Sequence, residues 1–494
     1  GRHTQGTHIR PHPIAEEDFI RSVGTVPRHT RVEAAGAIMS SAQYRMLSVA
    51  EATSEALERT PALPPVTASL CDCLGRVLAE DVKAQEPLPP FPASMKDGYA
   101  VVAADGPGEY PVIAEVRTGA AAESVVVKPG TVTYITTGSP VPSGADAVVM
   151  VELTENVAAG GDGVPRVIIK EAVKPGDDIR PIGCDIQANE TVLASGEILG
   201  AAEVGLLATV GAASFKVFPQ PHVALMSTGD EVVEPDTETL EHGQIRDSNR
   251  AMLFAACQGA GARVTDLGIA RDAEGQLEGL LDRAIREGVD ILITSGGVSM
   301  GDRDLIKPLL ERRGTVHYGR VKMKPGKPLT FATVEIGEGT GARRMLVFGL
   351  PGNPVSSLVT FHLVCVPAIR KMSGWKDPSL RRVHVKLSRP LKLDPQRPEY
   401  HRATVAWVPF PDGTFGGELV AESTGGQLSS RLLSARSANA LLELPAAEGV
   451  IPQGATVSAL LIGDLCAMTS AVSGVAMTPL PEGAIEKPHD PFKC

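Results

Sequence analysis

The chain has 494 residues, of which 43% are hydrophobic and 21% are charged, and its formal net charge is −11. Its length predicts about three domains with hydrophobic cores of their own, and its composition is typical of a globular protein. The acidic balance argues against general binding to nucleic acid or to an anionic membrane, so positive charge at any anion site must be local.

The pattern of cysteines indicates a reducing compartment, and the lengths of the apolar runs argue against a membrane span. Seven cysteines are scattered along the chain, and Cys71 and Cys73 have no second Cys/His pair at zinc spacing. An odd number without a framework pattern predicts plain thiols. No apolar run reaches about 18 residues, the length that a membrane-spanning helix needs, and the N-terminus has no apolar core of a signal peptide. We therefore expect a cytoplasmic protein without a membrane span.

An arm followed by a helix opens the chain. Residues 1–44 are rich in histidine and have few clustered apolar residues, which predicts a linker or a disordered arm. Ser48 and Glu51 have the Ser-x-x-Glu spacing of a capping box, so a helix is expected to begin there.

Two small subdomains follow. Residues 45–86 and 178–215 are assigned to a discontinuous, helix-containing subdomain I. Between them, residues 87–177 begin with a proline-rich connector and continue as short β-like runs punctuated by glycine. That pattern predicts a small β subdomain II.

The next part, residues 216–377, alternates strand-like and helix-like segments and is assigned to subdomain III. Asn353 is a good N-cap, and Pro354 suits the first position of the last helix. The alternation predicts a doubly wound parallel α/β fold, whose ligands should lie at the carboxyl ends of the strands. Strands are expected at 223–226, 263–267, 290–294 and 345–348, and helices at 249–258, 273–287, 305–312 and 354–371.

Short β runs return in residues 378–465, where a β-barrel-like subdomain IV is expected. Residues 466–494 carry four prolines and no periodicity, which predicts a tail. The fold class is therefore α/β plus β, in several subdomains.

A glycine-rich loop follows the apolar strand at 290–294. It reads Ser295-Gly-Gly-Val-Ser-Met-Gly301, with Asp302 and Asp304 directly after it. Small residues between a strand and a helix expose backbone N–H groups that suit a phosphate or another oxyanion. The alternative is a tight turn that needs glycine for backbone reasons only.

Acidic residues follow three of the predicted strands. Glu231 lies in Ser227-Thr-Gly-Asp-Glu231, Asp272 follows the second strand, and Asp304 follows the glycine loop. Carboxylates that converge on one edge of a parallel sheet suit a hydrated Mg²⁺, which prefers few carboxylates together with phosphate oxygens and water. Each acid taken singly can also be ordinary turn chemistry at the surface.

Positive charge gathers in a second loop, residues 320–328 (RVKMKPGKP), which holds Arg320, Lys322, Lys324 and Lys327. A solvated charged face is the usual explanation of such a run. Here prolines and a glycine stiffen the backbone, and cations that are already immobilised lose less side-chain entropy when they bind an oxyanion.

Six motifs stand in order along the chain: 89–101 (PPFPASMKDGYAV), 227–231 (STGDE), 244–250 (QIRDSNR), 294–301 (TSGGVSMG), 324–328 (KPGKP) and 350–356 (LPGNPVS). Together they resemble the molybdopterin molybdenumtransferase family, of the gephyrin E domain type. The resemblance covers about residues 45–465 and implies insertion of molybdate into adenylylated molybdopterin, with Mg²⁺-dependent release of AMP. It also implies four subdomains and a homodimer, whose cleft lies between subdomains III and IV of one chain and subdomain II of the other.

The resemblance implies roles for individual residues. Asp304, Asp272 and Glu231 would organise the metal and the phosphates, and Asp304 would help to cleave the phosphoanhydride; Asp97 and Lys324 complete the catalytic set. For the substrate, the resemblance implies that Gly296, Gly297 and Ser299 bind the pterin phosphate and that Arg320, Lys327 and Ser356 bind oxyanion charge. It implies that Thr137 and Asp178, with Asp97, come from the facing subunit. Two further implied oxyanion contacts are Arg402 and Ser434.

The chain also departs from the family pattern. Bacterial members have Lys where this chain has Arg320, which keeps the charge but makes proton transfer there implausible, because a guanidinium stays protonated. Gephyrin-like proteins carry a separate G domain that makes the adenylylated substrate. We expect this domain to be supplied either by another chain, a G-domain partner, or by a part of this protein outside the 494 residues. Two rival functions are a scaffold that anchors inhibitory receptor loops, as gephyrin does, and a nucleotide-binding protein without turnover.

Overall fold

The structure is a computed structural model that describes residues 44–119, 124–158, 163–271, 274–298, 305–339, 342–410 and 416–465. The predicted tail at 466–494 and, apart from Tyr44, the predicted arm at 1–44 lie outside the described residues. So do three candidate site residues, Asp272, Ser299 and Asp304.

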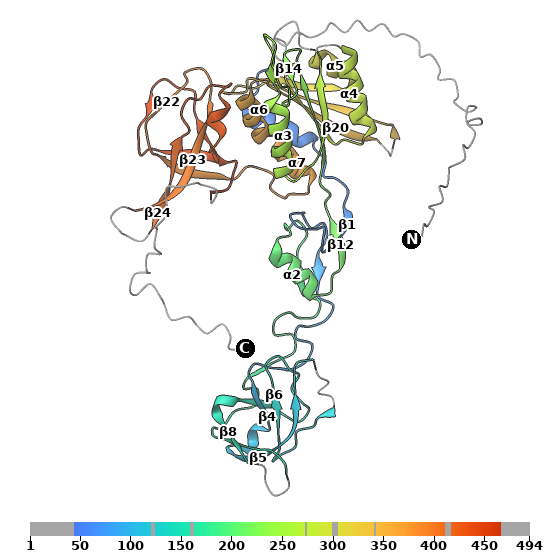
Figure 1. Cartoon of the computed structure of the whole chain (residues 1–494), viewed down its shortest axis with the longest axis vertical. Helices are drawn as coiled ribbons and strands as arrows, with labels where there is room; N and C mark the ends of the chain where they lie inside the picture. The colour runs from blue at the N-terminus through green and yellow to red at the C-terminus, as the bar shows by residue number, and fades with distance from the viewer. Residues whose placement is uncertain are drawn as a thin grey trace, which may run out of the picture. The chain divides into compact units, whose positions relative to one another are not determined.

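The α/β subdomain is built on a six-stranded sheet of order β16-β13-β17-β20-β19-β18 (Figure 1). The first four strands are parallel, as the sequence predicts. The last two were not predicted and run antiparallel to their neighbours, which makes the sheet mixed. The strands are β13 (His222–Thr228), β16 (Arg263–Ala270), β17 (Ile291–Ser295), β18 (Thr315–Arg320), β19 (Pro328–Ile336) and β20 (Arg343–Leu350).

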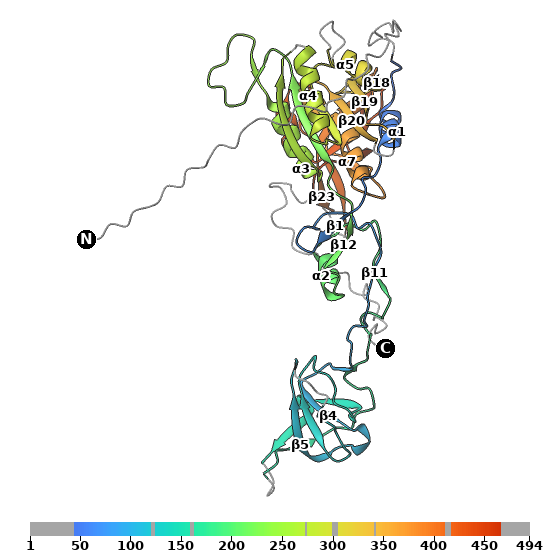
Figure 2. The same cartoon turned by 90° about the vertical axis from the view of Figure 1, so that its right-hand side faces the viewer.

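Helices cover both faces of this sheet (Figures 1 and 2). Because side chains alternate along a strand, Val223 and Leu225 pack on one face and Ala224 and Met226 on the other. The first face is covered by α3 (Ser248–Gly259), α6 (Pro354–Thr360), the π-helical segment η6 (Phe361–Cys365) and α7 (Val366–Met372), and the second by α4 (Glu274–Arg286) and α5 (Ile306–Arg313).

Helix α1 (Val49–Arg59) also belongs to the first core. Its capping box is confirmed: Ser48 Oγ accepts from the Glu51 N–H, and the Glu51 carboxylate accepts from the Ser48 N–H. Ala52 and Ala56 are fully buried against the helices at the end of the subdomain. This helix, assigned from the sequence to the segment 45–86, therefore packs on the α/β sheet.

One helical stretch, Pro354–Met372, has the length and apolar character of a membrane span, with 19 residues and a mean hydropathy of 1.2. Sequence reading had found no such stretch, because polar residues such as Thr360 and His362 interrupt it. In the fold, 78% of the stretch is buried, which is typical of a core helix.

A small helix-containing unit is formed by two chain segments, one that precedes subdomain II in the sequence and one that follows it. Its core includes Leu78, Leu199, Leu207 and Phe215. Its elements are the pairs β1 (Val66–Ser69) with β12 (Ser214–Val217) and β2 (Val82–Lys83) with β11 (Thr191–Leu193), together with α2 (Ala201–Thr209).

Subdomain II contains a six-stranded sheet of order β7-β4-β6-β5-β9-β8. Four of these strands lie where the sequence predicts β runs. The strands are β4 (Gly98–Val101), β5 (Gly108–Val116), β6 (Val132–Ile135), β7 (Ala147–Met150), β8 (Thr154–Val157) and β9 (Arg166–Ile169), with the turns η2 (Ala103–Asp105) and η4 (Val151–Leu153) and the pair β3 (Ala93–Ser94) and β10 (Ile179–Arg180).

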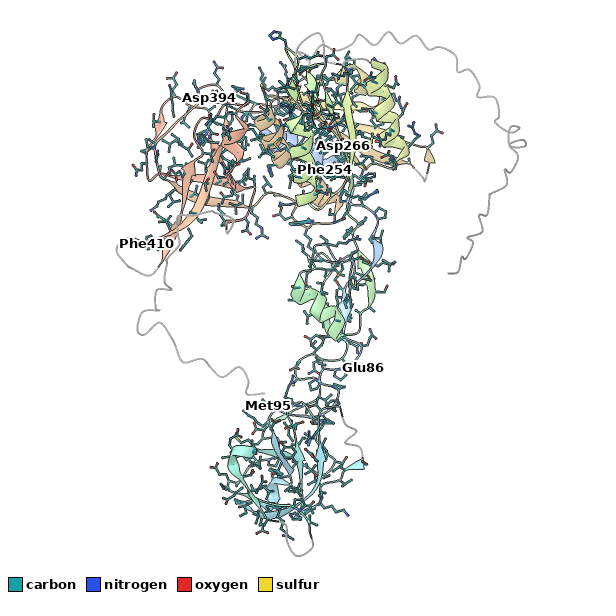
Figure 3. The ribbon with its side chains drawn as sticks, viewed as in Figure 1. Glu86, Met95, Phe254, Asp266, Asp394 and Phe410 are labelled. Carbon is teal, nitrogen blue, oxygen red and sulfur yellow. The ribbon has the colours of Figure 1, made fainter. Side chains whose placement is uncertain are left out.

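The C-terminal subdomain is a closed five-stranded barrel, so the barrel-like prediction is confirmed. Phe410, directly after β23, lies at the exposed end of this strand (Figure 3). The barrel strands are β21 (Arg382–Leu387), β23 (Glu399–Pro409), β24 (Gly417–Ser423), β25 (Ala440–Leu444) and β27 (Thr456–Leu461), accompanied by β22 (Leu391–Lys392), β26 (Val450–Ile451) and η7 (Leu432–Ala435). The five cysteines within the described ranges are free thiols, as expected.

Candidate active site

A cavity of about 690 Å³ lies at the carboxyl ends of β13, β17 and β20. This is the edge where the sequence predicts ligands, and the volume is in the range of small-molecule sites. The barrel contributes Ser430, and the Val355 N–H donates to Ser429 O at 3.1 Å, so the α/β subdomain and the barrel meet at the rim. The short pair β14 (Val232–Val233) and β15 (Ile245–Arg246) closes another side.

The loop after β17 requires glycine for two reasons, its backbone conformation and its close approach to the end of β13. Gly296 and Gly297 have φ values of +89° and +66°, which favour glycine. A Cβ at Gly296 would lie 2.7 Å from Thr228 O, and one at Gly297 would lie 2.8 Å from Thr228 Oγ1. The Gly296 N–H donates to Leu350 O at 3.1 Å and is therefore already used. The two glycines hold the loop against the end of β13, and both line the cavity.

Buried hydroxyls provide donors to the cavity. Ser227 and Thr228 line it and are 2% and 4% exposed, and their hydroxyl oxygens have no hydrogen-bond partner among the described residues. Buried polar groups normally find partners, because an unmade hydrogen bond costs about 1–3 kcal/mol. Each of these hydroxyls, on opposite faces of β13 at its carboxyl end, keeps hydrogen-bonding capacity that suits a ligand rich in acceptor oxygens.

Asn249 ties the loops of the site together. Its Nδ2 donates to Ser295 Oγ and to Gly352 O, each at 2.7 Å, while its buried Oδ1 has no hydrogen-bond partner in the described part of the chain. It lies in the first turn of α3, whose N-cap Asp247 accepts from the Arg250 N–H at 3.0 Å. The positive end of this helix thus faces the cavity beside the hydroxyls.

Asn353 occupies the N-cap position of α6 as predicted, but its side chain makes no capping hydrogen bond. It lines the cavity, whereas Ser356, one turn further along, is buried and does not.

Glu231 is the predicted metal-binding acid that the structure describes, and it lines the cavity. Its carboxylate folds back over Gly229, where a Cβ would lie 2.5 Å from Glu231 Oε2. Within the described ranges, no three His, Cys, Asp or Glu residues gather as a metal site. One carboxylate with neighbouring hydroxyl oxygens still fits Mg²⁺, which takes few protein carboxylates and completes its shell with phosphate oxygens and water. The proposed roles of Asp272, Ser299 and Asp304 stay predictions.

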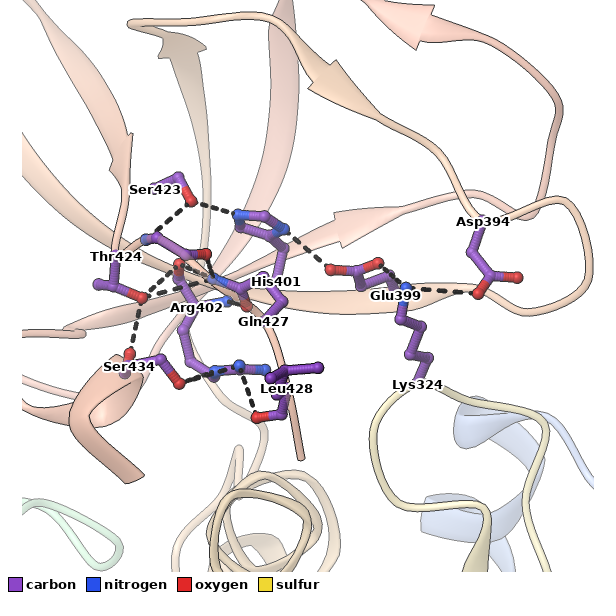
Figure 4. Close-up of polar contacts among 11 residues, drawn as sticks. Lys324, Asp394, Glu399, His401, Arg402, Ser423, Thr424, Gln427, Leu428 and Ser434 are labelled. Atoms are coloured by element: carbon purple, nitrogen blue, oxygen red, sulfur yellow. Dashed lines mark hydrogen bonds and ion pairs between the residues drawn. The ribbon is translucent and has the colours of Figure 1, made fainter. Parts of the chain in front are cut away.

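The basic loop between β18 and β19 is bound to the barrel. Lys324 Nζ contacts Glu399 Oε2 at 2.9 Å and Asp394 Oδ2 at 3.4 Å (Figure 4). Partial burial lowers the pKa of Lys324, but the hydrogen bonds and charges of Glu399 and Asp394 outweigh this effect and leave the pKa above its ordinary value of 10.5. The Arg320 guanidinium donates to Tyr44 O at 3.1 Å. The Lys327 ammonium has no ion pair among the described residues, and Pro328 beside it lines the cavity.

Arg402 and Ser434 are brought together inside the barrel. They are 1% and 0% exposed, and Arg402 Nε and Nη2 donate to Ser434 Oγ at 3.2 and 3.0 Å (Figure 4). Nη1 of Arg402 is buried and makes no hydrogen bond to any residue that the structure describes. Burial lowers the pKa of Arg402 to about 10. Neither residue lines the cavity, so their role as oxyanion contacts stays a prediction.

Three further candidates, Asp97 and Thr137 in subdomain II and Asp178 at its boundary with subdomain I, lie in turns. Asp97 Oδ1 accepts from the Thr137 N–H at 2.6 Å and from Thr137 Oγ1 at 3.0 Å. The Thr137 N–H, and then its hydroxyl, hold the pKa of Asp97 below its usual 3.8. Asp178 has a positive φ of 51°, and its carbonyl accepts from the Met95 N–H. None of the three lines the cavity described above, and their contribution to a facing subunit stays a prediction.

Sequence reading assigned no role to several residues that the structure brings forward. Ser227, Thr228 and Asn249 lay in motifs that were noticed, and their signal was their position at a strand end or a helix start. Glu399 and Asp394, which hold Lys324, gave no local signal, because they come from a different subdomain.

Three family models match the chain in order. The MoeA N-terminal region (domain I and II) matches residues 47–211, the probable molybdopterin binding domain matches 224–371, and the MoeA C-terminal region (domain IV) matches 384–462. The second of these contains the cavity lining from β13, β17 and β20.

Relatives and a solved structure agree with these matches. Gephyrin from Dictyostelium discoideum is 41% identical over 430 residues, which are 79% of this chain and 58% of that protein. Molybdopterin molybdenumtransferase 2 from Mycobacterium tuberculosis is 36% identical over 412 residues, or 81% of this chain and 96% of that protein. The molybdopterin biosynthesis MoeA protein from Pyrococcus horikoshii has a TM-score of 0.68 at 28% identity, and the match covers 84% of this chain and 99% of that one. The chain thus spans little more than half of the gephyrin and almost all of the bacterial protein, and it belongs to the molybdopterin molybdenumtransferase (MoeA) family.

Proposed function

We propose that the chain acts in molybdenum cofactor biosynthesis as a molybdopterin molybdenumtransferase, which inserts molybdate into adenylylated molybdopterin and releases AMP. The observation that carries the proposal is the cavity at the strand ends, which is lined by Glu231, by the start of α3 and by Ser227 and Thr228, whose buried hydroxyls have no hydrogen-bond partner among the described residues. A ligand for such a site is rich in anionic oxygens, as a phosphoanhydride and an oxometallate both are.

The side chains have separate tasks in this proposal. The hydroxyls of Ser227 and Thr228 donate to phosphate oxygens, and Asn249 keeps the loops around them at a fixed spacing. Two unit charges about 4 Å apart repel by roughly 4 kcal/mol at the effective dielectric near a protein surface, so the anionic groups need compensation. Mg²⁺, when bound, supplies part of it, and Glu231 with Asp272 and Asp304 would be its protein ligands.

Cleavage of the anhydride is assigned to the predicted acids Glu231, Asp272 and Asp304, and Asp304 would help to cleave it. The charge of molybdate or phosphate would be compensated by Lys324, Lys327 and Arg320. The pterin phosphate would be bound by the loop that contains Gly296 and Gly297. The proposal includes a homodimer in which Asp97 reaches the site of the facing chain. It also includes a G-domain partner that supplies the adenylylated substrate, which the similarity to a gephyrin supports.

The test is AMP release from adenylylated molybdopterin with Mg²⁺ present and molybdate titrated. Asp304→Ala is expected to abolish AMP release while nucleotide still binds, and Glu231→Gln is expected to raise the Mg²⁺ concentration needed for half-maximal release. Glu238→Gln, at an exposed position outside the cavity lining, is the matched control for removing one carboxylate. Normal turnover by Asp304→Ala would refute its role. If the wild-type chain released no AMP but bound a receptor-loop peptide in calorimetry, the scaffold alternative would replace the proposal.

A further inference from the structure

The loop that carries Lys324 is attached to the barrel through its backbone. The Lys324 N–H donates to Pro398 O at 2.9 Å, and the Tyr400 N–H donates to Lys324 O at 2.8 Å. Lys324 and Glu399 thus form a parallel bridge between two subdomains. Because both backbone groups of Lys324 are used, its Cα is fixed, and the direction of its side chain depends on what its ammonium meets.

The ammonium meets a chain of polar groups that runs through two barrel strands and ends at Ser423 (Figure 4). Glu399 Oε2 contacts Lys324 Nζ at 2.9 Å, and Glu399 Oε1 contacts His401 Nδ1 at 2.9 Å. His401 Nε2 contacts Ser423 Oγ at 2.7 Å, and Ser423 Oγ accepts from the Gly425 N–H.

The role of one ring atom in this chain is fixed by its partner. An ionised carboxylate only accepts, so His401 must donate to Glu399 from Nδ1. The Ser423 hydroxyl completes the chain at Nε2 of His401. Glu399 is 5% exposed, and a carboxylate so buried requires partners to stay ionised. Its pKa is nevertheless lowered: burial acts to raise it, but His401 and then Lys324 outweigh burial.

The pairing leaves Lys324 with unused capacity. An ammonium has three donors, and Glu399 and Asp394 account for two. The side chain is still 33% exposed, so the third donor is accessible to a ligand. Pro328, four residues along the same loop, lines the cavity. A cation held in place by partners loses little freedom when it binds an oxyanion, whereas a free lysine loses much more.

We propose that Glu399, held in turn by His401, is a positioning residue that fixes the Lys324 ammonium at the junction of the α/β subdomain and the barrel for an incoming oxyanion of the molybdate or phosphate class. The inference rests on the proposed function only for the identity of that oxyanion. Glu399 acts through Lys324 and does not itself contact the substrate. Asp394 is a weaker second partner, being longer in distance and more exposed.

The first test needs no enzymatic turnover. Glu399→Gln keeps an acceptor oxygen for His401 but turns an amide NH₂ group toward Lys324. An amide NH₂ group cannot accept a hydrogen bond from the ammonium. In the full chain, brief treatment with acetic anhydride followed by peptide mass spectrometry measures acylation of each lysine. We expect acylation of Lys324 to rise about tenfold relative to exposed Lys322 in Glu399→Gln, because a charge-assisted hydrogen bond is lost, and to rise less in Asp394→Asn. Lys371, whose Nζ donates to Leu57 O in the core, reports on the fold and should stay unchanged.

The second test uses AMP release and a double-mutant cycle. Glu399→Gln and Lys324→Met are each expected to raise the half-saturating molybdate concentration about tenfold, with a much smaller change in maximal rate. The double variant should be no worse than Lys324→Met alone, because Glu399 acts through that lysine.

The outcomes separate the two proposals. Unchanged acylation of Lys324 in Glu399→Gln, with Lys371 still protected, overturns the positioning role whatever the activity. Multiplying effects in the double variant also overturn it, because Glu399 would then act independently of Lys324. Absence of AMP release by the wild-type chain defeats the proposed function, while the acylation result still decides whether Glu399 positions Lys324.

Discussion

Gly296→Ala tests whether this position needs glycine because the loop lies close to Thr228 or only because its φ is positive. Gly288 is the matched control, because it also has a positive φ, +71°, and lies before β17 where Gly296 follows it. A Cβ at Gly288 meets nothing within 4 Å, whereas one at Gly296 lies 2.7 Å from Thr228 O. A left-handed conformation costs an L-residue about 1–2 kcal/mol, and overpacking adds about 1–3 kcal/mol. We expect losses of unfolding free energy of about 1–2 kcal/mol for Gly288→Ala and about 2–5 kcal/mol for Gly296→Ala.

The two tryptophans make the measurement specific. Trp375 lies just after α7, where Arg370 packs over its ring at 4.7 Å, and Trp407 is in the barrel and 56% exposed. In a Trp407→Phe background, urea unfolding followed by Trp375 fluorescence reports on the α/β subdomain alone, which matters because a chain of several subdomains need not unfold in two states. AMP release should fall only in Gly296→Ala. Equal losses of stability and of activity in both variants would refute the argument from close approach.

Three further outcomes are expected. The pKa of Asp97 in the folded chain is lowered from its usual 3.8, so its hydrogen bonds from Thr137 persist above pH 3.8 and are lost as the pH falls through the folded-state pKa. Hydrogen exchange at the Thr137 amide should show this loss, and Asp97→Asn should remove the pH dependence. Arg402→Met should keep the unfolding free energy or raise it by up to about 2 kcal/mol, because a buried cation is removed, while the half-saturating molybdate concentration rises; a large loss of stability in urea would contradict this. Asn249→Asp replaces a donor of two hydrogen bonds by an acceptor, and we expect at least tenfold weaker substrate saturation in the AMP assay; unchanged saturation would argue against its role.

Much of the α/β subdomain could be predicted because its signals are local. An apolar run such as 290–294 followed by small residues marks a buried parallel strand, and strands of this kind deliver their last residues to one edge. That reasoning placed Glu231, Gly296 and Gly297 together, and all three line one cavity. It did not find β18 and β19, because the charged loop between them dominated the interpretation of residues 315–336.

The rest could not be predicted because it depends on contacts between distant segments. The sequence showed Lys324 in a stiff cationic loop, but the carboxylates that hold it lie 70 and 75 residues further on, at Asp394 and Glu399. Likewise, Arg402 and Ser434 were named as separate oxyanion contacts, and their hydrogen bonds to each other follow from closure of the barrel. Such pairings change the meaning of a charged residue, since a cation already bound by carboxylates offers a ligand only its remaining donors.

The same logic explains how an acidic chain can bind a polyanion selectively. Three of the cations near the cavity are engaged: Arg250 pairs with three carboxylates, Arg246 donates to backbone carbonyls, and Lys324 is held from the barrel. Donors at the cavity wall are instead neutral and fixed, namely the hydroxyls of Ser227 and Thr228 beside the start of α3. Fixed neutral dipoles stabilise an anion without attracting every anion in solution. They do not cancel its full charge, so tight binding of the substrate should require a divalent cation, and nucleotide affinity measured with and without Mg²⁺ would reveal that dependence.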